Sequence, residues 1–263
     1  QPAVRGILAR LRDSFQDRLF VRTSHGMVPT QRALDLAVPV RRVLSEVETL
    51  LRPPGFDPAS ANLTLDVAAT DYALQAVVVP FIGALSRHCP GVRLSVHPLD
   101  HDAVHGQLER GEIAWAFLTP DSTPPDLHAR ALFDETYVCA MRAEHPDARG
   151  ESLALDRFCE LRHALVSYTG KRFWGVTDEA LARIGLSRHV ALSVTSFLVL
   201  VDVLRTTDLI AVAPRRLMEG VAGLRVVSPP VAVPGFTKSV AWHERTHHAP
   251  AQRWLRNLLF ETC

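Results

Sequence analysis

The sequence predicts an α/β protein with a small basic N-terminal segment, a linker helix and two α/β lobes. Its 263 residues suit about two domains. After residue 62, short apolar strands alternate with helical stretches, which indicates parallel sheets covered by helices. Residues 53–62 are rich in turn-forming residues and separate this pattern from the preceding one, so we expect a hinge linker there.

Charge and composition favour a protein with a nucleic-acid contact region over a membrane-spanning or secreted protein. Residues 1–52 hold nine Lys/Arg and five Asp/Glu, whereas the remainder holds 20 and 23, so we expect a small nucleic-acid contact region on a slightly acidic body. No stretch approaches the roughly 18 consecutive apolar residues of a membrane span, and no secretory signal is evident. The four cysteines form no CxxC pair, which favours a reducing compartment. We therefore expect a cytoplasmic protein that does not contact a membrane.

Two short elements are predicted before residue 30. Residues 1–13 place apolar side chains at helical spacing on one face, at Val4, Ile7, Leu8 and Leu11. The string "LFVRTSHGMVPT" (19–30) then predicts a strand, a tight turn and a second strand. Gly26 can adopt the positive φ that such a turn requires.

A second helix is predicted at about residues 30–51, with Thr30 as its N-cap. Its apolar residues recur at spacings of three and four over three heptads. A stripe of this kind on an exposed helix needs a partner, and a coiled coil across a homodimer supplies one. Pro39 lies inside the stripe and should bend the helix.

The remaining residues predict two βαβ groups that divide near residue 162. We expect lobe I to comprise 63–162 and 232–263, and lobe II to comprise 163–231. Ligands of such sheets bind beyond the carboxyl ends of the strands. The expected strands are 63–70, 92–99, 113–119, one or two within 127–142, 163–168, 189–195, 209–214, 224–228 and 238–245, and the expected helices are 73–86, 102–110, 173–184, 196–205, 215–221 and 250–260.

Polar residues follow three of the predicted strands and could face the crevice between the lobes. Hydroxyl groups and free N–H groups at helix starts can bind an anion, although Asp71 would repel one. An alternative is that these residues only cap helices. Further candidates border the predicted crossings between lobes, where a small aromatic or carboxylate ligand could stack and pair. The full set of expected effector contacts is Thr70, Asp71, Tyr72, Thr119, His163, Ser167, Tyr168, Thr195, Ser196 and Trp242.

The sequence contains two histidine clusters that could be considered as metal sites. His97, His101 and His105 have helical spacing, but Pro98 interrupts them, and the second cluster is His243, His247 and His248. We interpret both as surface histidines rather than metal sites. The chain contains no nucleophile elbow, Walker loop or GxGxxG string, so we expect neither an enzyme nor a cofactor.

The string "QPAV…LARLRDSFQDRLFVRTSHGMVPTQRA" resembles the LysR-type transcriptional regulators, in particular the branch of nodulation and aromatic-catabolism regulators. The resemblance implies that residues 1–30 are part of a winged helix-turn-helix (its recognition helix and wing) and that 31–52 is the linker helix for dimerisation. It implies that 63–263 is an effector-binding domain similar to a two-lobe periplasmic-binding protein. The sequence departs from the family pattern in two ways. The chain opens at the recognition helix, so we expect it to begin inside a longer gene product. Position 5 is Arg where the family usually has Ser, and Gly6 follows it.

The resemblance implies a regulator whose promoter binding is modulated by a small-molecule effector in the interlobe cleft. Its expected partners are double-stranded DNA, that effector, and further copies in a homodimer or homotetramer. Glutamine and arginine can contact base edges in the major groove, and wing residues can contact phosphates. The alternative, a solute-binding protein of the periplasmic type, leaves residues 1–52 unexplained. The expected DNA contacts are Gln1, Ala3, Arg5, Arg10, Arg22, Thr23 and His25.

Overall fold

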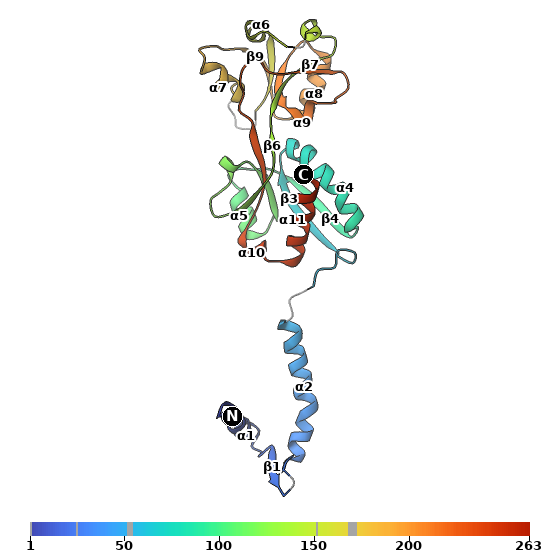
Figure 1. Cartoon of the computed structure of the whole chain (residues 1–263), viewed down its shortest axis with the longest axis vertical. Helices are drawn as coiled ribbons and strands as arrows, with labels where there is room; N and C mark the ends of the chain where they lie inside the picture. The colour runs from blue at the N-terminus through green and yellow to red at the C-terminus, as the bar shows by residue number, and fades with distance from the viewer. Residues whose placement is uncertain (1, 25, 52–54, 151, 168–172) are drawn as a thin grey trace. The chain divides into compact units, whose positions relative to one another are not determined.

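The computed structural model describes residues 2–24, 26–51, 55–150, 152–167 and 173–263. The chain divides into an N-terminal unit, Gln1–Gly55, and a C-terminal unit, Phe56–Cys263 (Figure 1). Among the described residues, every helix is too short or too polar to cross a membrane.

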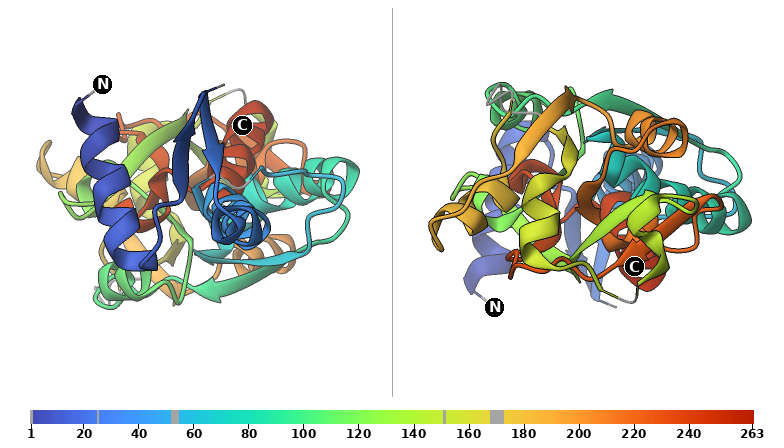
Figure 2. Two further views of the ribbon diagram at one scale, coloured as in Figure 1. Left: turned by 90° about the horizontal axis from the view of Figure 1, so that it is seen from below. Right: turned by 90° about the horizontal axis from the view of Figure 1, so that it is seen from above.

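The N-terminal unit consists of a helix, a hairpin and a long helix, as predicted. Its elements are α1 (Pro2–Phe15), β1 (Phe20–Thr23), β2 (Gly26–Pro29) and α2 (Gln31–Leu51). The two strands pair antiparallel, with Val21 opposite Val28, and lie between α1 and the near end of α2 (Figure 2, left). Gly26 has φ +122°, which a residue with a side chain rarely adopts. Pro39 lies within α2.

Asp17 ties the base of the hairpin to the start of α2. Its Oδ1 accepts hydrogen bonds from the Leu19 amide and the Thr30 hydroxyl, both at 2.6 Å. These hydrogen bonds, the one from Thr30 first, lower the pKa of the Asp17 carboxyl. The Thr30 oxygen also accepts from the Ala33 amide at 3.2 Å, which confirms the predicted N-cap. Leu19 is held at φ +57°, in the left-handed region.

Five strands form the first sheet of the C-terminal unit, in the order β4-β3-β5-β12-β6. β3 is parallel to β4 and β5, whereas β12 is antiparallel to β5 and β6. The predicted wholly parallel sheet is therefore wrong, because β12 enters from the second sheet and runs the opposite way. The strands are β3 (Leu63–Ala69), β4 (Val92–Pro98), β5 (Trp115–Leu118), β6 (His128–Glu135) and β12 (Phe236–Trp242).

Helices connect and cover this first sheet. The helix predicted at 73–86 is divided by a π-helical segment with the label η1. The strand predicted at 238–245 ends at Trp242 and gives way to a short helix. The helices are α3 (Asp71–Ala73), η1 (Leu74–Val78), α4 (Val79–His88), α5 (Val104–Arg110), η2 (Pro120–Ser122), α10 (Glu244–His247) and α11 (Pro250–Thr262).

The second lobe contains β7 (Tyr137–Arg142), which pairs antiparallel with both β10 (Ala211–Pro214) and β11 (Leu224–Val227). The predicted boundary near residue 162 is therefore wrong. Only Thr136 separates the end of β6 from the start of β7, so the chain crosses between sheets without a helix. Lobe II accordingly begins at β7, and in Figure 1 β6 leads directly toward it.

A parallel pair, β8 (Arg162–Val166) and β9 (His189–Val194), completes lobe II. A parallel bridge between His163 and Ile210 joins this pair to the chain just before β10. The helix α6 was not predicted from the sequence. The helices of this lobe are η3 (Pro146–Arg149), α6 (Leu155–Glu160), α7 (Val176–Ala182), α8 (Phe197–Thr206) and α9 (Arg215–Met218).

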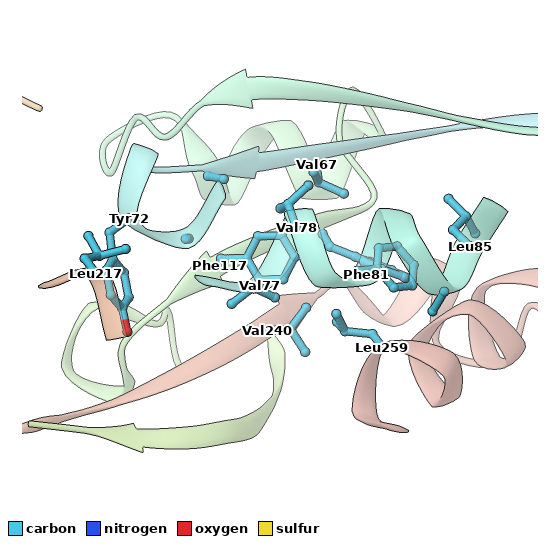
Figure 3. Packing of buried hydrophobic residues seen from close by; sticks show 14 of the residues in the cluster. Val67, Tyr72, Val77, Val78, Phe81, Leu85, Phe117, Leu217, Val240 and Leu259 are labelled. Atoms are coloured by element: carbon cyan, nitrogen blue, oxygen red, sulfur yellow. The ribbon is translucent and has the colours of Figure 1, made fainter. Parts of the chain in front are cut away.

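The main hydrophobic core continues from lobe I into lobe II. On the lobe I side, Phe81 packs tilted against Trp115, with ring centroids 5.7 Å apart. Figure 3 shows Val77 and Val78 facing Phe117 of the sheet, and Leu217 of α9 beside Tyr72. Because apolar burial drives folding roughly in proportion to area, this shared core couples the stability of the two lobes.

Candidate functional site

Two parallel strands end side by side at the edge of the first sheet that faces lobe II. Ala68 of β3 lies opposite Ala116 of β5, so Thr70 and Thr119 follow neighbouring strand ends. Thr70 caps α3, because its hydroxyl accepts from the Ala73 amide at 3.3 Å. This edge is the location that the sequence predicts for ligand contacts.

Asp71 reaches from lobe I to the first turn of α8 in lobe II. Its Oδ2 accepts from the Phe197 amide at 2.6 Å and from the Leu198 amide at 3.4 Å. Ser196 caps the same helix by accepting from the Val199 amide at 3.3 Å. A carboxylate at a helix N-terminus is stabilised by the helix dipole. The start of α8, expected to bind an anionic ligand, is therefore occupied by the protein's own carboxylate, while Thr195 beside it is exposed.

Tyr72 is buried and makes an internal contact. Its hydroxyl donates to Glu135 Oε2 at 2.7 Å, and the other Glu135 oxygen accepts from the Thr136 amide at 2.9 Å. Burial of the Tyr72 phenol raises its pKa, and the hydrogen bond to Glu135 raises it further by a smaller amount. The Tyr72 ring also contacts Phe197 and Phe236 edge-on. Tyr72 of α3 thus contacts α8 and the two places where the chain crosses between the lobes. These crossings are the end of β6 before Thr136 and the segment that leads into β12.

Lys238 is a buried cation that sequence analysis missed. Its ammonium donates to the Phe117 carbonyl at 2.8 Å and lies 5.9 Å from the centroid of the Tyr72 ring. Burial lowers the pKa of Lys238 to about 8. The alternation along β12 could have located it, because Lys238 shares a strand face with Val240 and Trp242.

A cavity of about 520 Å³ opens where the two crossings meet the end of β5. Threonine hydroxyls, carboxylates and one aromatic ring surround it. Thr237 donates to Asp134 at 2.6 Å, and Thr119 bonds with Ser122 at 3.0 Å. Of the predicted effector residues that the structure describes, only Thr119 contributes to the lining. The lining residues are Thr119, Pro120, Asp121, Asp134, Glu135, Thr136, Gly235, Phe236 and Thr237.

His163 lies in the interior of lobe II and does not face the cavity. Its Nε2 donates to the Phe158 carbonyl at 2.7 Å, and its Nδ1 accepts from Arg188 at 3.2 Å. Arg188 in turn pairs with Asp178 at 2.8 Å. Burial, with a smaller contribution from Arg188, lowers the pKa of His163 to about 4, so the ring is neutral at pH 7. Its predicted role as a ligand contact is replaced by a structural one.

Trp242 lies at the far end of β12 from the crossings. Trp242 pairs with His128, which is the first residue of β6. The crossing to lobe II follows Glu135, which is the last residue of β6. The prediction that it borders the interlobe crevice is wrong, because β12 runs antiparallel to β5. Ser167 donates its amide to the Val194 carbonyl at 2.9 Å, and Tyr168 lies outside the described residues.

The predicted DNA contacts lie on α1 and the β1–β2 hairpin. Arg5 and Arg10 are exposed on α1, which also contains Ala3, and Arg22 and Thr23 are exposed on β1. The Thr23 hydroxyl donates to the Gly26 carbonyl at 3.1 Å and so braces the turn. The remaining two predicted contacts, Gln1 and His25, lie outside the described residues.

Comparison with known proteins identifies the family. A family model for the LysR substrate binding domain matches residues 59–263. The HTH-type transcriptional activator NagR of a Ralstonia species is 33% identical over 267 residues, which cover 99% of this chain and 87% of NagR. The chain belongs to the LysR-type transcriptional regulators. The resemblance seen in the sequence is thereby confirmed, and the chain belongs to a family of regulators rather than enzymes.

Further relatives and solved structures resemble the chain in sequence or in fold. Nodulation protein D 2 of a Bradyrhizobium strain is 31% identical over 273 residues, covering 99% of this chain and 78% of that protein. The regulatory domain of MexT, a transcriptional activator in Pseudomonas aeruginosa, is 27% identical over 78% of this chain and all of that domain, with a TM-score of 0.68. Full-length CbnR, crystallised with its target DNA, is 13% identical and shares the fold, with a TM-score of 0.61 over 99% of this chain and 89% of CbnR.

Proposed function

We propose that this LysR-type regulator binds promoter DNA through α1 and the β1–β2 hairpin, and that a small molecule at the lobe-facing edge of the first sheet modulates this binding. The main support is the cavity of about 520 Å³ there, which both crossings between the lobes line. A ligand in this position touches the strands that connect the lobes. It can therefore favour one lobe arrangement over another, which is the requirement for coupling to a second site.

The chemistry of the lining supports a class of effector. Phe236 offers a ring for stacking, and Thr119, Thr136 and Thr237 offer hydroxyls. Asp121, Asp134 and Glu135 also contribute carboxylates, which would repel an anion in this cavity. Of the two predicted classes, we therefore favour a small aromatic compound with hydroxyl or amine donors over a simple carboxylate. Such a mixture of apolar surface and a few polar groups is typical of ligand sites.

The start of α8 offers a second position where a ligand could bind. Thr195 is exposed beside the start of α8, and Thr70 lies near it through the bond between Asp71 and Phe197. A ligand that contacted Thr195 and Ser196 would compete with Asp71 for the amides of this helix. We expect an anionic effector, if one binds, to use this position rather than the cavity.

Thermal shift measurements with phenols, aromatic amines and aromatic acids test the effector. We expect at least one hydroxylated aromatic compound to raise the melting temperature of the chain. Thr237→Val, which removes a hydroxyl from the cavity, should reduce that shift by more than half, whereas Thr195→Val should retain it. The opposite result would move the site to the start of α8. A full shift in both variants would remove both positions.

DNA binding is tested with the upstream region of the gene in a gel-shift experiment, with and without the compound found above. We expect the compound to change the affinity or the footprint of the complex. A ligand that raises the melting temperature but leaves DNA binding unchanged would contradict the proposed coupling. α2 carries the apolar stripe for a homodimer, and paired units on DNA would place two recognition helices on one site.

A further inference from the structure

Three metal-ligating side chains from two distant parts of the chain meet at the end of lobe I away from lobe II. They are His128 at the start of β6, and Glu244 and His247 in α10. Figure 1 shows α10 at the end of the first sheet that points away from lobe II and its strand β7. One potential ligand atom from each lies within 4.8 Å of the other two. The His248 Nε2 adds a fourth group at 3.8 Å from Glu244 Oε1.

We propose that His128, Glu244 and His247 bind a zinc ion. Zinc takes imidazole nitrogen and carboxylate oxygen together, and sets of two histidines and one glutamate are among its known protein ligands. Magnesium and calcium prefer oxygen ligands alone and fit this set poorly. His128 Nε2 and a Glu244 carboxylate oxygen are already in direct contact. When a neutral His128 ring binds zinc through Nε2, its single N–H proton is carried on Nδ1.

The surrounding contacts hold these side chains in place before any ion binds. The backbone pairing of Trp242 with His128 fixes the start of β6 against the end of β12. The rings of His128 and His247 stack with centroids 4.0 Å apart. Arg256, which is buried, donates to the His247 carbonyl at 2.6 Å and fixes the end of α10. A ligand set that is held in position loses less conformational entropy when it binds an ion.

Trp242 gives the site its own reporter. The Trp242 indole N–H donates to His247 Nδ1 at 3.1 Å, so in the neutral ring the proton of His247 lies on Nε2. The lone pair that zinc can take is then the one on Nδ1, and its coordination removes the hydrogen-bond partner of the indole. Zinc binding should therefore change the fluorescence of Trp242, which is one of four tryptophans in the chain.

The string "HERTH" (243–247) has the spacing of the zinc protease motif, but its geometry differs. α10 spans only Glu244–His247, so His243 and His247 are not two positions on one face of a continuous helix. His243 precedes the helix with extended backbone, and its Nδ1 accepts from the Arg245 amide at 3.2 Å. Glu244 is accordingly proposed as a zinc ligand rather than a general base, and the site as structural or regulatory rather than catalytic.

Zinc titration of the tag-free chain tests this site, in a Cys263→Ser background that removes the exposed thiol. We expect one zinc ion per chain, with a dissociation constant of about 10 µM or tighter in competition with a zinc indicator. His128→Gln and Glu244→Gln should each weaken binding at least about tenfold. The control variants His105→Gln and His243→Gln, which lie outside the proposed ligand set, should change it less than about twofold.

Trp242→Phe supplies the second measurement. We expect this variant to bind zinc and to lose the fluorescence response. Glu244 is 60% exposed in its side chain, so Glu244→Gln should keep the melting temperature of the metal-free chain. The proposal is overturned if the chain binds no stoichiometric zinc, if Glu244→Gln binds as tightly as the parent, or if the fluorescence change persists in Trp242→Phe.

Discussion

The two units of the chain bury their apolar residues to very different extents. In the N-terminal unit, Leu19 is the only buried hydrophobic residue among those described, whereas α2 exposes a stripe that includes Leu44 and Val47. The C-terminal unit buries one core cluster across both lobes and two smaller ones. Residues 56–263 therefore bury apolar cores of their own, whereas the first unit leaves nearly all of its described apolar side chains exposed or half-buried.

The largest effect should follow from placing a charge in the stripe of α2. Val47→Asp should weaken self-association at least about 100-fold, because an unpaired carboxylate would be buried between two apolar helices. Sedimentation velocity over a range of concentrations measures this. Ser45→Asp introduces the same charge on α2 at a position outside the apolar stripe, and it should leave the self-association unchanged. Equal loss in both variants would contradict the proposed coiled coil.

The next effect concerns the self-contained interior of lobe II. The folded chain keeps His163 neutral down to about pH 4, whereas an unfolded chain protonates it near pH 6.5. The unfolding free energy should therefore fall as the pH drops from 6.5 toward 4, by up to about 3 kcal/mol. Urea unfolding at several pH values measures this loss.

A His163→Gln variant is the control for that pH dependence. Glutamine can donate to the Phe158 carbonyl and accept from Arg188, but it does not titrate. We expect the difference in stability between parent and variant to vary with pH over this window. A constant difference would show that His163 is not the group responsible.

A smaller effect is expected at the contact between lobes. Asp71→Ala removes the acceptor for the Phe197 amide, which should lower the unfolding free energy by about 1–2 kcal/mol. Hydrogen exchange at the Phe197 and Leu198 amides should become faster. Asp100→Ala is the matched change within lobe I, where Asp100 accepts from the Asp102 and Ala103 amides. That variant should leave exchange at Phe197 unchanged, and faster exchange in both would mean the effect is general destabilisation.

The smallest effect belongs to the hairpin of the N-terminal unit. Arg22→Ala should weaken DNA binding by a similar factor on different sequences and reduce the salt dependence of log K by about 1, as for one lost phosphate contact. Fluorescence anisotropy at several salt concentrations measures the slope. Arg42→Ala, on α2 and paired with Glu46 at 3.2 Å, should preserve it. An unchanged slope for Arg22→Ala would place that side chain away from the phosphates.

Local signals in the sequence were sufficient for most elements. Apolar spacing located α1 and α2, Gly26 located the turn, and Thr30 marked the start of α2. These features depend on residues close together in the chain. The family followed from one string that combines the first helix and the hairpin.

Long-range pairing explains what the sequence did not predict. β7 belongs to the second sheet because it pairs with strands at 211–214 and 224–227. The sequence of residues 137–142 alone does not reveal these partners. His163 was predicted to contact ligand because it begins a strand near the crevice, but Phe158 and Arg188 enclose it. Trp242 was misplaced for the same reason, since the direction of β12 is fixed by its neighbours. The cavity combines segments near residues 119, 135 and 236 that no local pattern connects.

The π-helical segment Leu74–Val78 has a consequence for insertions and deletions in this region. A wide turn of this kind contains one residue more than a regular helix needs to span the same path. Deleting one of these residues would remove the wide turn between α3 and α4, while Pro80 would still lack the amide for one helical hydrogen bond. The same deletion would rotate α3 by about 100° relative to α4 and turn Tyr72 away from Glu135. A homologue that lacks this extra residue should therefore require a different side chain to face Glu135.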